Sequence, residues 1–186
     1  LTYLISKDVQ EKKQNERFEI YTQALDVDYA NLDQAVAAAR IAASCYKNSY
    51  RQLERDYKAG RVGKEEMLAR LQEIRAGTGD AAAILKEFND SAAENIQTYA
   101  EVVKQENTRK TDKLEAKDMR TVTQKTKKVV DKKKESDQLL AELENTSTVI
   151  DKSIDSVMTA GADPRDLLAA FGPDSFDECG PCSKTI

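Results

Sequence analysis

The sequence predicts an all-α protein, an elongated antiparallel three-helix bundle or coiled coil that ends in a short helix and an irregular tail. Three stretches carry this prediction, residues 18–57, 67–102 and 119–157, because apolar residues recur in each at alternating steps of three and four. Such spacing gives a helix one apolar stripe that packs against other helices. The composition agrees, since 33% of the residues are charged and only 7 are Gly and 3 are Pro.

The first helix is expected over residues 8–59. It should start near Ser6 or Asp8, because serine and aspartate are favoured N-cap residues, although the apolar stripe begins only at Phe18. The helix should end before Gly60, because glycine suits the left-handed conformation that often follows a helix C-terminus. Gly60 and Gly63 therefore predict a tight hairpin turn into a second, antiparallel helix.

The second helix is expected over residues 64–105. Gly77 and Gly79 interrupt its apolar pattern, and two glycines inside a helix cost about 2 kcal/mol relative to alanine. We expect a packing kink or a short break at these glycines. A hinge is the alternative interpretation.

The third helix is expected over residues 112–160, after a turn placed within residues 105–118. That segment is almost wholly polar, and a continuous helix over residues 80–158 is the alternative. The stripe of the third helix is diluted by three polar residues, Thr126, Lys133 and Ser136. This dilution predicts loose packing there, or a position reserved for a partner.

The bundle should occupy residues 1–160 and be followed by a separate segment, residues 161–186. Asp163 is a favoured N-cap, Pro164 suits the first helical position, and Gly172 suits the position after the last turn. These signals predict a short helix over residues 164–171. The remaining tail is expected to be irregular.

The tail contains a CxxC motif, Cys179-Gly180-Pro181-Cys182. Thioredoxin-like redox use of this spacing requires a preceding strand and a βαβ unit, which the helical pattern does not provide. A local disulfide in an exported tail is the favoured interpretation. A metal site shared with another chain and disulfide exchange are the alternatives. Cys45 is expected to be a small residue near the third helix, and a free thiol if the other two cysteines pair.

A basic segment, residues 109–134, could contact nucleic acid or anionic lipid. Arginine is rare in it, aromatic residues are absent, and the whole chain has a net charge of −4. We therefore expect a solvated or intramolecular face, and we disfavour nucleic acid and membrane partners. Its candidate contact residues are Lys125, Lys127, Lys128, Lys132, Lys133 and Lys134.

Histidine is absent from the chain, which excludes Ser-His-Asp and Cys-His catalysis within it. Because the Glu-x-x-His pairs of di-metal bundles cannot occur, no cofactor is expected. No run of about 18 apolar residues predicts a transmembrane helix. The sequence begins at Leu1 without methionine, so we expect a removed leader, a cut fragment or a non-standard start written as leucine. A removed leader would make this an exported or periplasmic protein, which is slightly favoured over a cytoplasmic one.

These observations predict a non-enzymatic coiled-coil scaffold, adaptor or spacer. It would act through helix–helix contacts with protein partners, self-association among them. The alternatives are a thiol module that uses Cys179 and Cys182, and binding of an anionic partner through residues 109–134.

Overall fold

A computed structural model describes residues 1–159 of the chain, and within this range it contains helices and no strand. The three long helices pack against one another, which confirms the prediction of an all-α helical bundle. They are α2 (Gln14–Lys58), α3 (Lys64–Thr108) and α4 (Ala116–Met158), and the short helices η1 (Thr2–Ile5) and α1 (Lys7–Gln10) precede them. The short helix predicted over residues 164–171 and the tail lie outside the described residues.

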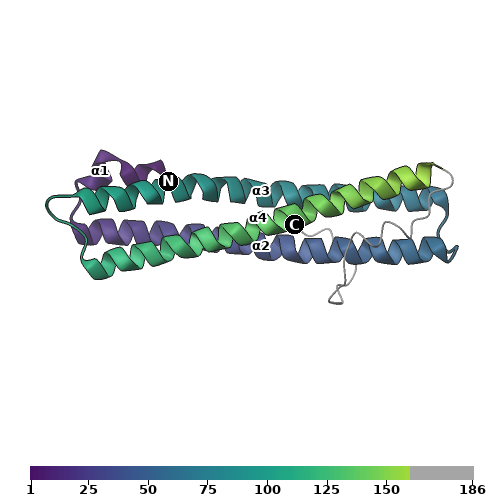
Figure 1. Ribbon diagram of the computed structural model, residues 1–186, viewed down its shortest axis with the longest axis horizontal. Coiled ribbons are helices and arrows are strands. Elements are labelled where there is room, and N and C mark those ends of the chain that lie inside the picture. Colours follow the sequence, from purple (N-terminus) through teal and green to yellow (C-terminus); the bar gives the residue numbers. More distant parts are fainter. Residues whose placement is uncertain (160–186) are drawn as a thin grey trace. The chain divides into compact units, whose positions relative to one another are not determined.

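The chain divides into two compact units, and each contains a segment of all three long helices (Figure 1). Unit 1 comprises residues 1–36 and 86–137, and unit 2 comprises residues 37–85 with the part of the chain from residue 138 onwards. Within each unit, the α3 segment runs antiparallel to the α2 and α4 segments.

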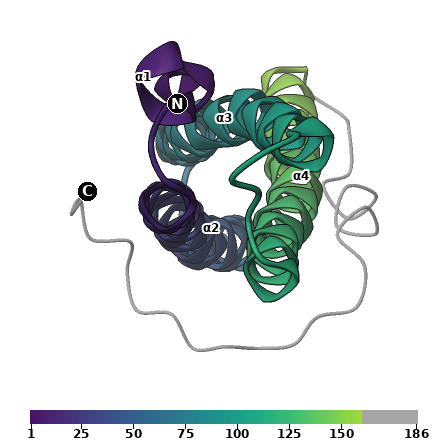
Figure 2. The same ribbon diagram turned by 90° about the vertical axis from the view of Figure 1, so that its left-hand side faces the viewer.

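Each unit has its own apolar core, built from the stripes that the sequence predicts. In unit 1, the segments of α2, α3 and α4 surround a common axis, and α1 lies outside them beside α3 (Figure 2). The unit 1 core includes Leu4, Val9, Tyr21, Leu25, Tyr99, Val102, Val122 and Val129. The unit 2 core includes Tyr50, Leu53, Val62, Met67, Leu71, Ile74, Val149 and Ile150.

The first long helix begins at Gln14, later than the predicted residue 8. Residues before it form η1 and α1 instead, and the chain reverses at residues 11–13. A physical reason is the burial of Leu4 and Val9, which are 0% and 7% exposed in the unit 1 core. One straight helix would carry these side chains past the end of the core, whereas the reversal folds them onto it.

The turn between α2 and α3 contains Gly60 and Gly63. Gly60 has a φ of 69°, a conformation in which a side chain would be strained. The Gly60 N–H donates to the Tyr57 carbonyl and the Arg61 N–H donates to the Asp56 carbonyl, at 3.0 and 2.9 Å. This pair of bonds is the Schellman arrangement, which satisfies the last carbonyls of α2.

Helix α3 continues through Gly77 and Gly79, so the short break that the sequence suggested is absent. Gly77 instead accommodates an aromatic ring of α2, since a Cβ atom built on it would lie 2.2 Å from the Tyr46 hydroxyl oxygen. The cost of a glycine inside a helix is therefore offset by close packing between α3 and α2. A Cβ atom built on Gly79 would lie 3.3 Å from the Arg75 Nη1 atom, at the end of a flexible side chain.

The turn between α3 and α4 spans residues 109–115, within the predicted interval. The continuous helix that was the alternative is therefore wrong. Asp112 in this turn has a φ of 52°, the one positive value at a non-glycine residue in the described chain. Leu114 is 7% exposed and joins the unit 1 core, which fixes the turn against the helices.

Two of the three polar residues of the α4 stripe have polar partners within the described chain. The Thr126 hydroxyl donates to the Val122 carbonyl at 2.9 Å, and the Lys133 ammonium lies 2.9 Å from the Asp137 carboxylate. Ser136 is 0% exposed, as are Val122 and Val129 on either side of Thr126. Thr126 and Lys133 thus have polar partners within the described chain, whereas the buried Ser136 hydroxyl has no hydrogen-bond partner among the described residues.

Candidate functional site

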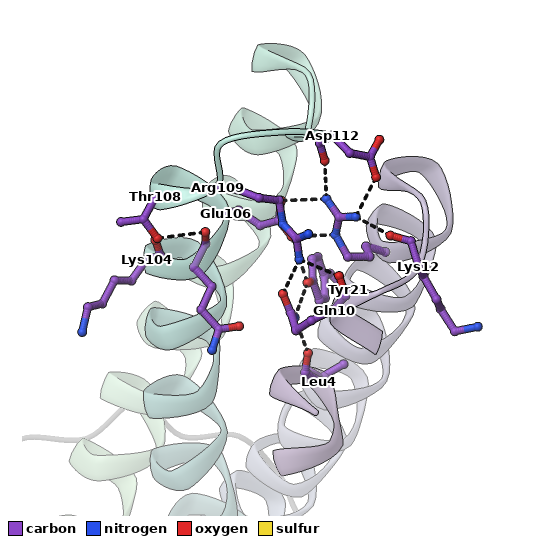
Figure 3. Close-up of polar contacts among 11 residues, drawn as sticks. Leu4, Gln10, Lys12, Tyr21, Lys104, Glu106, Thr108, Arg109 and Asp112 are labelled. Atoms are coloured by element: carbon purple, nitrogen blue, oxygen red, sulfur yellow. Dashed lines mark hydrogen bonds and ion pairs between the residues drawn. The ribbon is translucent and has the colours of Figure 1, made fainter. Parts of the chain in front are cut away.

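The most elaborate polar site in the described chain is centred on Arg17, in the first turn of α2. Its side chain is 0% exposed, and so is the side chain of Glu106, close to the end of α3. A buried ion pair is costly to desolvate and persists only where geometry and further hydrogen bonds are good. The surrounding contacts meet that condition. We call this group of residues the Arg17 clamp, with Glu106, Asp112, Tyr21 and Gln10 as its other members (Figure 3).

All five N–H donors of Arg17 are engaged. Nε and Nη2 bond the two carboxylate oxygens of Glu106 at 2.8 and 3.1 Å, a bidentate pair. Nη1 donates to the Asp112 carboxylate at 3.1 Å and to the Lys12 carbonyl, and Nη2 donates to the Asp112 carbonyl at 2.6 Å. One side chain thereby joins the turn before α2, the end of α3 and the turn before α4.

The positive φ of Asp112 belongs to this arrangement. A left-handed conformation at an aspartate is uncommon and is retained where the surroundings determine it. Here both the carbonyl and the carboxylate of Asp112 accept hydrogen bonds from Arg17. The turn is therefore held in a strained conformation by the guanidinium.

Gln10 and Arg109 extend the clamp to the N-terminal segment. Arg109 Nη2 donates to the Gln10 carbonyl and to its side-chain oxygen at 2.8 and 2.6 Å. The Gln10 amide donates to the Tyr21 hydroxyl and to the Leu4 carbonyl, both at 2.9 Å. These bonds fasten α1 to α2 and α3 within unit 1.

The electrostatics of the clamp favour a permanently charged guanidinium. Burial alone lowers the pKa of Arg17, but hydrogen bonds to Glu106 and Asp112 outweigh it and raise the pKa above its ordinary value. Burial also raises the pKa of Tyr21 to about 12, and the neighbouring Glu106 charge acts in the same direction. Neither group is poised to exchange protons near neutral pH.

A second polar contact in unit 1 links α2 to α3. The Asp28 carboxylate accepts hydrogen bonds from the Tyr99 hydroxyl at 2.7 Å and from the Asn95 amide at 2.9 Å. Burial raises the pKa of Asp28, and the two hydrogen bonds oppose that rise. Burial is also the main reason why the pKa of Tyr99 is raised.

Four of the six candidate lysines have carboxylate partners within unit 1. Lys125 pairs with Asp26, Lys133 pairs with Asp137, and Lys134 lies 4.0 Å from Asp131. Lys132 lies 2.7 Å from Asp33 and 2.8 Å from Glu135, and these carboxylates raise its pKa. Within the described part of the chain, Lys127 and Lys128 have no carboxylate within 4 Å.

A half-open cavity of about 320 Å³ lies beside these ion pairs, between α2 and α4 of unit 1. Two of the residues that line this cavity contact each other, because the Lys132 ammonium lies 5.8 Å from the centre of the Tyr29 ring. The charges of the lining balance, because three lysines face three carboxylates. The lining residues are Leu25, Asp26, Tyr29, Lys125, Lys128, Asp131, Lys132 and Glu135.

The cysteines are only partly described. Cys45 lies on α2, is 8% exposed and is disulfide-bonded, whereas the sequence analysis made it a free thiol only if Cys179 and Cys182 pair with each other. Cys179 and Cys182 lie outside the described residues. Within residues 1–159, no three Cys, Asp or Glu side chains lie close enough together to hold a metal ion. In the same range, no helix combines the length and the apolar character that crossing a membrane requires.

The sequence interpretation missed the clamp. Arg17 was included in a polar N-terminal run, and Glu106 and Asp112 were treated as turn residues. The hairpin glycines lie at the α2–α3 turn, and Gly77 packs on Tyr46.

A scan against protein-family models and searches of curated proteins and of solved structures found no match to this chain.

Proposed function

We propose that this protein is a non-enzymatic helical scaffold or adaptor, which binds protein partners through the outward faces of its long helices. The observation that carries the proposal is the Arg17 clamp. Its buried charged groups bond each other, and Arg17 also bonds the backbone of two turns through the Lys12 and Asp112 carbonyls. Groups engaged in this way fix the positions of helix ends, which is what a scaffold requires, and they leave no donor for a substrate.

The ion pairs between α2 and α4 support the same proposal. In unit 1, Lys125 and Lys132 pair with Asp26 and Asp33 at positions seven residues apart on both helices. Such a ladder opposes axial sliding of one helix past the other. A surface with a fixed register can present its side chains to a partner without first paying an ordering cost.

The test is site-specific photo-crosslinking in the cells that produce the protein. A photo-reactive residue is placed, one position at a time, on two exposed faces. One face is on α2 of unit 1 and the other is on α4 of unit 2. The positions are Gln23, Val27, Ala30 and Gln34 on α2, and Ala141, Asn145, Thr148 and Lys152 on α4.

A scaffold should give protein adducts of discrete mass at neighbouring positions of one face and weaker adducts on the other, which serves as the matched control. Purified variants are checked for helix content by circular dichroism. If folded variants give no protein adduct at any of the eight positions, these two faces do not bind partners and the proposal fails for them.

A thiol module is a second candidate, because Cys45 is disulfide-bonded. A helical bundle of this size does not need a covalent link to fold, so the bond suggests an oxidising compartment or thiol chemistry. Mass mapping of unreduced peptides identifies the partner of Cys45. Thiol titration and metal analysis of Cys179→Ser and Cys182→Ser variants then separate a structural bond from exchange or metal binding. Inert, metal-free thiols in every variant would end this candidate.

Binding of an anionic partner through residues 109–134 remains the third candidate, and the observed pairing of four lysines weighs against it. We expect no salt-dependent binding to duplex DNA or to anionic vesicles. Binding that falls in Lys127→Glu with Lys128→Glu, two lysines without carboxylate partners among the described residues, would revive it.

A further inference from the structure

The N-terminal segment of the protein packs on the core of unit 1 through a few apolar side chains and is joined to α2 by a short connection. We call residues 1–10, which form η1 and α1, the strap. Leu4 and Val9 are its buried side chains, and Leu1 and Ile5 pack against the same core. The same core contains Tyr21 of α2 together with Tyr99 and Val102 of α3, and a single short connection, residues 11–13, links the strap to α2.

The polar contacts of the strap are concentrated at the end next to this connection. Gln10 accepts two hydrogen bonds from Arg109 and donates one to Tyr21. The carbonyl of Lys12, in the connection itself, accepts from Arg17. The connection is therefore a hinge whose closed form is held by the clamp.

The strap is suited to open while the bundle stays folded. Only Leu4 and Val9 of the strap are buried, Leu1 and Ile5 are partly buried, and its side-chain hydrogen bonds to the long helices all involve Gln10, so little offsets the conformational entropy of its own residues. Segments with so few buried contacts open locally at a small fraction of the global unfolding free energy. When the strap opens, it uncovers apolar side chains, the unpaired Nη2 donors of Arg109 and the acceptor lone pair of the Tyr21 hydroxyl, whose own proton remains bonded to Glu106.

We propose that the strap of a second copy of this chain docks on the surface that an open strap uncovers, so that two molecules exchange straps and form a dimer. Exchange reproduces every strap contact between molecules, and only the hinge differs from the monomer. A second copy fits because the surface is matched to Gln10 in its hydrogen bonds and to Leu4 and Val9 in its apolar contacts. The inference rests on the scaffold role and names a partner for it.

A pair of complementary variants tests the exchange. Gln10→Lys places an ammonium beside Arg109, and Arg109→Glu removes both bonds to Gln10, so each variant alone docks its own strap poorly. In a mixture, Lys at position 10 of one molecule meets Glu at position 109 of the other, and Gln10 of the second meets Arg109 of the first. Native mass spectrometry of ¹⁴N- and ¹⁵N-labelled chains counts the mixed dimers.

The amount of mixed-label dimer should be at least ten times the amount formed in a mixture of ¹⁴N- and ¹⁵N-labelled parent protein at the same concentration. The double variant, which carries both changes in one chain, should return to the parent level because it is complementary within itself. The matched control is Lys47→Glu mixed with Glu142→Lys, which interrupts an exposed ion pair of unit 2. No excess of mixed dimer, or an equal excess in the control, overturns the proposal.

Two further measurements identify the docked segment. Leu4→Asp added to both complementary variants should abolish the mixed dimer, and persistence of the dimer would show that the strap is not the contact. A synthetic peptide of residues 1–13 should compete with the exchange. If a scrambled peptide of equal amphipathicity competes as well, the surface accepts unrelated helices and a second copy is not its specific partner. Photo-crosslinks on the helix faces would still support a scaffold if strap exchange failed.

Discussion

Arg17 is the residue on which the largest single-site effect is expected. Arg17→Ala leaves the Glu106 carboxylate buried without its bidentate partner and frees the strained Asp112 turn. Removal of one partner of a buried ion pair typically destabilises a protein by about 3–5 kcal/mol. We expect a loss of this size in the free energy of unfolding, measured by urea denaturation followed by circular dichroism.

Two controls define the cause of that loss. Arg75→Ala interrupts a partly exposed pair with Asp151 and should cost less than about 1 kcal/mol. Arg17→Met combined with Glu106→Leu removes both buried charges and should recover much of the stability. If the double variant is as unstable as Arg17→Ala, the unpaired carboxylate is not the reason for the loss.

Tyr21 should make stability fall at alkaline pH. Its pKa is raised to about 12 in the folded protein, against 10.0 for a free tyrosine, and burial is the main cause. Because the unfolded chain releases this proton first, the contribution of Tyr21 is complete below pH 10 and is lost as the pH rises through 12. The shift corresponds to a loss on the order of 3 kcal/mol.

The measurement for Tyr21 is the urea midpoint between pH 9 and 12, together with tyrosinate absorbance. Tyr21→Phe should lose less stability than the parent over this interval, although Tyr99, whose pKa is also raised, contributes to the slope of both proteins. Equal slopes in the two proteins would mean that Tyr21 does not report the buried site.

At the level of single residues, the sequence contained a signal for the clamp that pattern analysis did not use. Arg17 lies four residues before Tyr21, and Glu106 lies four residues after Val102. Both positions therefore continue the apolar stripes of their helices, with opposite charges at the ends that an antiparallel hairpin brings together. The left-handed Asp112 could not be foreseen, because its conformation depends on contacts with a residue 95 positions away.

At the level of elements, Gly77 is expected to be required by packing and Gly79 is not. In Gly77→Ala, the new Cβ would lie 2.2 Å from the hydroxyl oxygen of Tyr46, so the ring must move. Overpacking of this kind typically costs about 1–3 kcal/mol, which exceeds the gain in helix propensity. Gly79→Ala meets only the flexible end of Arg75 and should stabilise the protein by up to about 1 kcal/mol.

Thermal denaturation of the two variants provides the comparison. Tyr46→Ala introduced with Gly77→Ala should remove the additional cost of the alanine, because the ring is no longer present. If Gly77→Ala stabilises α3 as much as Gly79→Ala does, the close approach of Tyr46 does not constrain the helix.

The elements also show why some boundaries were predictable and others were not. The α2–α3 turn follows from local chemistry, since Gly60 supplies the left-handed conformation that ends α2. The reversal at residues 11–13 depends on the burial of Leu4 and Val9 in a core formed by distant residues. A helix start at Ser6 or Asp8 was locally reasonable, and Ser6 is the N-cap of α1, but tertiary packing ends that helix at Gln10.

At the level of the whole molecule, α2, α3 and α4 each pass through both units without interruption. Loss of helix from one unit alone would end three helices in mid-course and expose the backbone groups of their new termini. We therefore expect unfolding to be a single cooperative transition, although each unit contains a core cluster of its own. The strap, which can open on its own, is outside this expectation.

The absence of tryptophan allows each core to be observed separately. Phe18→Trp reports unit 1 and Tyr57→Trp reports unit 2, because both side chains are partly buried at the edge of their cores. Urea midpoints from the two tryptophans should coincide with each other and with the midpoint from circular dichroism. Midpoints that differ between the two tryptophans, with a matching step in circular dichroism, would show that the units unfold independently and that continuous helices do not couple them.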